Sequence, residues 1–215
     1  WPESPNENAR HSIGQVLYAL RRDVISAEAV LGTTTLRLNP EVVGCDAWEL
    51  DTAARAGDVA RVAELYAGPF LDGVRVRGSA ELDHIIDAER ARLFALQAQA
   101  LESLARTAAS EGKAHAAVGW WRRLAAHEPL SSRIALEFVG SLAAAGDRTA
   151  ALDAARVHET LVRDELGASP DPTFSAFVER LTREPAPAPS LVTREEPPAP
   201  RARAGAAEAE HDVAV

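Results

Sequence analysis

The feature that most constrains the fold is a spacing of 34 positions between two glycines. Gly112 and Gly146 each end one apolar segment and begin another, in the contexts Glu-Gly-Lys and Ala-Gly-Asp. Small residues follow both glycines at the same offset, at 116–117 and 150–151. A period of this length with small residues at the corners is typical of tetratricopeptide-like helical repeats. One such repeat cannot bury its own apolar face, so the neighbouring segments are predicted to be helical too.

Composition agrees with helices and excludes several classes of site. The chain is 47% hydrophobic but only 5% aromatic, which favours packed helices over sheets. No segment is broadly basic, which counts against non-specific nucleic-acid binding. Cys45 is the only cysteine, so there is no disulfide framework and no cysteine-based metal site. No apolar run approaches the roughly 20 residues of a membrane span. We therefore expect a cytoplasmic protein with no membrane contact, metal or cofactor.

Residues 9–24 are predicted to form an amphipathic helix. Its apolar stripe is made of Ile13, Leu17, Leu20 and Val24. The opposite face carries His11, Gln15, Tyr18 and Arg22, and Arg10 and Arg21 flank it. Such a face can reach base edges and phosphates, but it can equally be an ordinary solvated surface. Gly14 weakens this helix by roughly 1 kcal/mol relative to alanine.

Two short β-prone runs follow, at 29–31 and 35–38, around Gly32-Thr33-Thr34. They predict a hairpin that ends at Asn39-Pro40. A polar-faced helix followed by a hairpin is the second half of a winged helix-turn-helix. In that fold the helix enters the major groove of DNA and the hairpin touches the backbone or minor groove.

From residue 46 onward the sequence predicts a series of helices. The expected segments are 46–56, 58–67, 79–110, 113–127, 132–145, 147–166 and 173–183. The predicted N-caps include Asp46, Asp58 and Thr173. A loop with a buried Phe70-Leu71 pair is expected at 68–73. Of Trp120 and Trp121, which point about 100° apart on a helix, only one can be central to the core.

Glu89 falls within the predicted apolar stripe of helix 79–110, whose members are Leu82, Ile86, Leu93, Leu96, Ala100 and Leu104. A buried carboxylate needs a partner, because an isolated buried charge is very costly. The simpler interpretation is a structural ion pair with an arginine such as Arg122 or Arg123. The alternative is a carboxylate that senses a ligand or acts as a switch.

Nothing in the sequence points to catalysis. There is no phosphate-cradling glycine loop, no His-Glu-x-x-His pair, and no serine or cysteine in a nucleophile setting. His84 and Asp87 share a helix face near Asp83, which is a weak metal-like cluster and more typical of a solvated surface. Residues 184–215 are rich in proline and alanine and are predicted to be a disordered tail or linker.

Several of these segments resemble one known family. The segments at 1–5, 9–12, 17–22 and 36–40 resemble the end of the winged helix of bacterial antibiotic-regulatory (SARP-type) transcription factors. The segments at 45–49, 65–73, 89–93 and 165–167 resemble the bacterial transcriptional activator domain (BTAD) that follows it in those proteins. The most specific part is Gly-Pro-Phe-Leu-Asp-Gly at 68–73. Two departures are the absence of the strands and helices that begin a winged helix, and Gly14, where a larger residue is common.

The resemblance implies a mostly α chain in three parts. Residues 1–44 would be a partial winged-helix DNA-binding domain, residues 45–183 a tetratricopeptide-like activator domain, and residues 184–215 the tail. It also implies a transcriptional activator that binds double-stranded DNA through the recognition helix, forms a homodimer and contacts RNA polymerase. The candidate DNA contacts are then Arg10, His11, Gln15, Tyr18 and Arg22. The alternative function is a protein-interaction scaffold that does not bind DNA itself.

Overall fold

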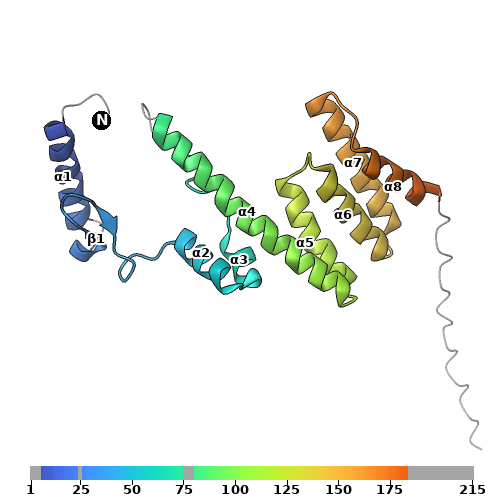
Figure 1. The fold of residues 1–215 in the computed structure, drawn as a ribbon, viewed down its shortest axis with the longest axis horizontal. Coiled ribbons are helices and arrows are strands. Elements are labelled where there is room, and N and C mark those ends of the chain that lie inside the picture. Colours follow the sequence, from blue (N-terminus) through green and yellow to red (C-terminus); the bar gives the residue numbers. More distant parts are fainter. Residues whose placement is uncertain (1–5, 24–25, 75–79, 184–215) are drawn as a thin grey trace, which may run out of the picture. The chain divides into compact units, whose positions relative to one another are not determined.

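The structure is a computed structural model that describes residues 6–23, 26–74 and 80–183 (Figure 1). The predicted tail at 184–215, the predicted cap Ser79 and the stripe residue Val24 lie outside the described residues. The described part is mostly α-helical, as the sequence predicts. Its first elements are α1 (Asn6–Asp23), η1 (Ala27–Ala29), β1 (Val30–Leu31) and β2 (Arg37–Leu38). The elements that follow are α2 (Asp46–Ala56), α3 (Val59–Leu65), α4 (Ala80–Ser110), α5 (Ala114–His127), α6 (Ser132–Ala144), α7 (Arg148–Leu166) and α8 (Pro172–Arg183).

The predicted hairpin after the first helix is confirmed. β1 and β2 pair antiparallel, with Val30 opposite Leu38 and Leu31 opposite Arg37. Gly32 has a φ of 93°, and a Cβ at this position would lie 2.0 Å from the carbonyl oxygen of Thr35. The turn therefore requires glycine both for its backbone conformation and for its close backbone approach.

The repeat corners have the geometry that their glycines predict. Gly57, Gly112 and Gly146 have φ values of 72°, 73° and 84°, which lie in the left-handed region. At each corner the glycine N–H bonds the carbonyl three residues back, and the next N–H bonds the carbonyl five residues before it. This is the Schellman arrangement, which satisfies the last carbonyls of a helix. The same corner is thus used three times.

Consecutive helices of this array pack side by side (Figure 1). α3 packs against α2 and α4, α5 lies between α4 and α6, and α8 contacts both α6 and α7. Three buried clusters follow one another along the array, and the central one contains Leu101, Trp121 and Ile134. Ala117 and Ala151, which lie 34 positions apart, are both buried. Small side chains at the repeat positions therefore allow the close helix packing that the spacing predicts.

Several predicted boundaries need correction. Asp46 is the first residue of α2 rather than its cap, because Cys45 holds the cap position. The carboxylate of Asp46 instead accepts a bond from the N–H of Ala47. α3 ends at Leu65, two residues earlier than expected. Leu71, predicted to be buried, is 44% exposed.

The start of α8 also differs from the prediction. Pro172 is the first helical residue, where its fixed φ and missing N–H fit the first turn. Asp171 therefore takes the capping role predicted for Thr173, and its carboxylate accepts the Thr173 N–H at 2.7 Å. The predicted cap Asp58 is confirmed, since its carboxylate accepts the N–H of Arg61 at 3.0 Å.

Candidate functional site

The exposed face of α1 is the first candidate site. The five candidate DNA contacts are all exposed: Arg10, His11, Gln15, Tyr18 and Arg22. The ring of Tyr18 adds an apolar group to this set, and 69% of the residue's area is exposed. The helical spacing therefore brings His11, Gln15, Tyr18 and Arg22 to one surface, whereas Arg10 lies at its edge and lines a hollow together with Ile13 and Leu17.

Two side-chain pairs organise this face. The Gln15 amide donates from Nε2 to His11 Nε2 at 2.9 Å, so these two side chains lie together one turn apart. The Arg22 guanidinium donates two bonds of 2.7 Å to the carboxylate of Asp23. This pairing raises the pKa of Arg22 and lowers the pKa of Asp23 from their ordinary values. Both groups are exposed, so a phosphate can compete with Asp23 for the guanidinium.

The hairpin is tied to the same helix. Arg21, which flanks the candidate face, donates a hydrogen bond from Nη2 to the carbonyl oxygen of Val30 at 3.0 Å. Val30 in turn pairs with Leu38 in the strand ladder. Arg21 therefore positions the hairpin beside the C-terminal turn of α1, a role that the sequence did not reveal. Arg37 on β2 is exposed.

The apolar side of α1 is only partly covered. Ile13 is 39% exposed, Val16 is 50% exposed, and Leu17 and Leu20 are half-buried. A hollow of about 260 Å³ lies between this side of the helix and the hairpin. A Cβ added at Gly14, which lines the hollow, would meet no atom within 4 Å. A larger residue at position 14 would therefore fit.

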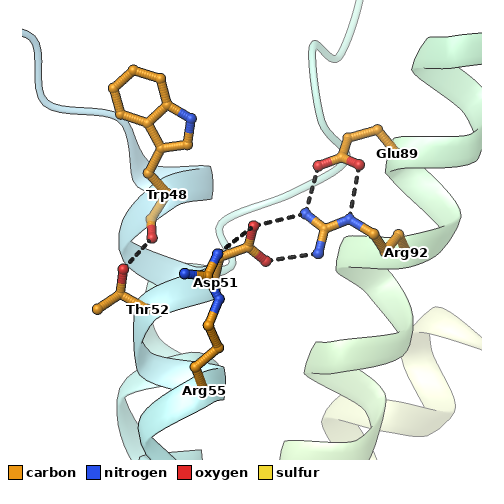
Figure 2. Close-up of polar contacts among 6 residues, drawn as sticks. All are labelled: Trp48, Asp51, Thr52, Arg55, Glu89 and Arg92. Atoms are coloured by element: carbon orange, nitrogen blue, oxygen red, sulfur yellow. Dashed lines mark hydrogen bonds and ion pairs between the residues drawn. The ribbon is translucent and has the colours of Figure 1, made fainter. Parts of the chain in front are cut away.

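The second candidate site is the ion-pair cluster around Arg92 on α4. Figure 2 shows the Arg92 guanidinium between the carboxylates of Glu89 and Asp51. The bonds to Glu89 are 2.6 and 2.8 Å, and those to Asp51 on α2 are 2.7 and 3.1 Å. Arg55 reaches the other side of Asp51 at 3.9 Å. The cluster therefore ties α2 to α4.

This geometry corrects the prediction for Glu89. An arginine does pair with it, but the partner is Arg92, one turn away on the same helix, and neither Arg122 nor Arg123. The Arg92 hydrogen bond lowers the pKa of Glu89 against the opposing effect of desolvation. Bonds to Glu89 and then Asp51 raise the pKa of Arg92 above its usual range. The signal for this pair was its i, i+3 spacing on a helix.

The two arginines first considered have other contacts. Arg123 donates to the carbonyl of Ala63 at 2.8 Å and lies 5.3 Å from the ring centroid of Trp120. Arg122 lies 5.9 Å from the ring centroid of Phe138. Trp121, in contrast to half-exposed Trp120, is buried at 3% exposure, as the prediction of one central tryptophan requires.

The weak His84 cluster of α4 is on the surface. His84, Asp83 and Asp87 are all exposed, and Asp87 is engaged by Arg90 at 3.1 Å. Within the described ranges, no three histidine, cysteine or acidic side chains are grouped closely enough to hold a metal ion. Over the same ranges, no helix is long and apolar enough to cross a bilayer.

Comparison with known proteins identifies the helical region. The family model described as bacterial transcriptional activator domain matches residues 45–182. Among solved structures, that of Mycobacterium tuberculosis EmbR in complex with a low affinity phosphopeptide matches with 23% identity and a TM-score of 0.52. The match covers 85% of this chain and 52% of the EmbR chain, so the chain spans about half the length of that protein. At this identity the likeness shows the fold alone. No curated protein matches the sequence.

Proposed function

Because the chain belongs to the bacterial transcriptional activator domain family, we propose that it is a DNA-binding transcriptional activator whose reader is α1 with the β1–β2 hairpin. The observation that carries the proposal is the exposed face of α1. On this face His11, Gln15, Tyr18 and Arg22 lie together, with Arg10 at its edge, beside a hairpin that Arg21 holds in place. In a winged helix, such a helix lies in the major groove and the hairpin lies on the adjacent backbone.

The five side chains divide by chemistry. Gln15 and His11, joined to each other, would read base edges, since an amide can bond adenine in two places. Arg10 and Arg22 would bind phosphates, with Arg22 exchanging the Asp23 carboxylate for a phosphate oxygen. Tyr18 would contact the backbone through its hydroxyl. This division predicts that the two groups of residues affect binding in different ways.

The domain arrangement is part of the same proposal. Residues 1–44 would contribute to the winged-helix reader, residues 45–183 would form the activator domain, and residues 184–215 would be a linker or tail. The activator domain would support a homodimer, receive a signal and contact RNA polymerase. These roles place the protein in the cytoplasm, where its DNA target is.

The test is a selection from a random duplex pool with the protein expressed from its complete gene. Enrichment of a direct repeat or a palindrome is expected, and the half-site spacing would report the dimer geometry. On the selected site, Arg22→Ala should weaken binding to all sequences and reduce the salt slope of log K by about 0.9, the value for one phosphate contact. Gln15→Ala should leave the slope unchanged and relax the preference at one base pair.

Arg55→Ala is the matched control, because Arg55 is also an exposed helical arginine paired with an aspartate but lies on α2. It should bind as the parent protein does. A Gln15→Ala and Arg22→Ala double variant that binds like the parent would contradict the assignment of α1 as the reader. A folded protein that enriches no sequence would favour the interaction-scaffold alternative.

A further inference from the structure

The hydrogen bond between His11 and Gln15 on α1 has a defined direction. It joins Nε2 of the Gln15 amide to Nε2 of the His11 ring at 2.9 Å. An amide nitrogen can only donate, so the ring nitrogen accepts and the neutral imidazole carries its proton on Nδ1. The bond therefore fixes the tautomer of His11 and also decides which end of the Gln15 amide is turned toward the ring.

This direction determines what the Gln15 amide can present to a base. A glutamine amide has two N–H groups and one oxygen. His11 takes one N–H, so one N–H and the oxygen remain. A donor and an acceptor match adenine in the major groove, where N7 accepts and the N6 amino group donates. Guanine presents two acceptors there, N7 and O6, so it would set the amide oxygen against a second acceptor.

The opposite orientation of the same amide would favour the other purine. If the oxygen of Gln15 faced residue 11, both N–H groups and no acceptor would remain. Two donors match N7 and O6 of guanine. The oxygen and nitrogen ends of an amide have nearly the same shape, so sterics alone do not choose between the two orientations. The side chain at residue 11 makes that choice.

Nothing else fixes the orientation of this amide. Both side chains are exposed, so packing does not hold them. Over residues 6–23, 26–74 and 80–183, the bond to His11 is the one hydrogen bond of the Gln15 side chain. Such a bond contributes little in bulk water, but it strengthens where a base pair excludes water from around it. Its effect on base preference is therefore expected in the DNA complex.

We propose that His11 is a positioning residue that gives Gln15 its preference for adenine over guanine, by holding the amide with its nitrogen toward the imidazole. His11 acts through Gln15 and needs no bond of its own to that base. A group that makes a specific contact is commonly held in place by hydrogen bonds from a neighbouring side chain. The inference rests on the assignment of α1 as the DNA reader and deepens it by naming the base class that Gln15 reads.

The first experiment tests the bond without DNA. Heteronuclear NMR of the imidazole nitrogens distinguishes the two neutral tautomers of His11 in the protein expressed from its complete gene. The measurement is made at about pH 8, where imidazoles are largely neutral. We expect the proton on Nδ1, and we expect this preference to be lost in Gln15→Ala. A proton on Nε2 of His11 in the parent protein would overturn the proposal, whatever its DNA binding.

The second experiment measures base preference on the duplex obtained by selection. The base pair that Gln15 reads is the one at which Gln15→Ala relaxes the preference. At this pair the parent protein should prefer adenine to guanine at least about fivefold, the lower end for a bidentate contact. His11→Ala should reduce that ratio about two- to tenfold, the value of one hydrogen bond, and should leave the salt slope unchanged. A ratio equal to that of the parent would refute the role of His11.

Two further substitutions at residue 11 should act in opposite directions. His11→Glu supplies only acceptors, so it should keep the adenine preference although its charge weakens binding to all sequences. His11→Lys supplies only donors, so the oxygen of Gln15 should turn toward it and guanine should be preferred at the same pair.

A double variant distinguishes this mechanism from a direct contact. The guanine preference of His11→Lys should vanish when Gln15→Ala is added, whereas a lysine that bound guanine itself would retain it. Retention in the double variant, or equal base preferences in His11→Glu and His11→Lys, would refute the proposal while leaving the DNA reader in place. A selection that enriches no sequence would instead refute the reader, and this inference with it, even if His11 carries its proton on Nδ1.

Discussion

Replacing Gly146 and Gly119 by alanine, one at a time, applies the same chemical change to two backbone environments. Gly146 ends α6 with a φ of 84°, whereas Gly119 lies inside α5. A Cβ at either position would meet no atom within 4 Å, so steric clashes with other residues do not contribute. The two substitutions therefore isolate the backbone conformation, and we expect them to change stability in opposite directions.

The magnitudes follow from the two conformations. A left-handed backbone costs an L-residue about 1–2 kcal/mol, and the stiffer unfolded chain of the alanine variant returns about 0.4–1 kcal/mol. Gly146→Ala should thus destabilise the protein by roughly 0.5–1 kcal/mol. Gly119→Ala should stabilise it by about 0.5–1 kcal/mol, since glycine inside a helix is less favourable than alanine by that amount. The two variants should differ by about 1–2 kcal/mol.

Urea unfolding followed by tryptophan fluorescence and far-UV circular dichroism measures both changes, provided that the slopes of the transitions agree. Gly146→Asn serves as a further control, because asparagine adopts the left-handed conformation more readily than alanine and should restore part of the loss. If Gly146→Ala stabilised the protein as Gly119→Ala does, the corner would not depend on a left-handed residue, and the explanation of the repeat spacing would fail.

Three further predictions concern packing and charge. Trp121→Ala should cost about 3–5 kcal/mol in urea unfolding, whereas Trp120→Ala should cost clearly less because Trp120 is half-exposed. Arg92→Ala should cost about 1 kcal/mol more than Arg55→Ala, since Arg92 bridges two helices, and the difference should shrink in high salt. The hydrogen bond to the Thr173 side chain and then that to its amide lower the pKa of Asp171 below its ordinary 3.8. The resulting stabilisation is present above that value and lost as pH falls through the folded-state pKa, so the advantage over Asp171→Asn should disappear in acid.

The corners were predictable because each depends on a local property. A glycine at a helix end indicates a left-handed backbone. An aspartate directly after it indicates the N-cap of the next helix, as at Gly57-Asp58. Caps without such a glycine were predicted less well. The choice between Asp171 and Thr173 depends on where the helix begins within two residues, and Pro172 decides it by occupying the first turn.

The buried face of α4 could be predicted only in part. Ile86, Leu93 and Ala100 of the expected stripe are buried, but so are Gln97 and Leu101. The buried surface is wider than one stripe because α4 packs against α3 and also against α5. A single amphipathic pattern does not contain this information, since it depends on the positions of two neighbouring helices.

Contacts between distant segments were also beyond the sequence pattern. The bond from Arg92 joins it to Asp51, 41 positions away, so only the packing of α2 on α4 reveals it. On α1, the exposure of the candidate face followed from its period, but the bond from Arg21 to the hairpin did not. The assignment of that face to DNA stays a prediction.

The repeated corner has a consequence for how such a chain can change length. The segment from Lys113 to Gly146 contains α5 and α6 and is bounded on both sides by the same backbone geometry. Because each helix pair of this array rests mainly on its immediate neighbours, an added or deleted copy of this segment would join at corners of unchanged shape. Recombination at the two glycines would thus add or remove one helix pair. It would lengthen or shorten the surface of the helical array without changing the helices at either end.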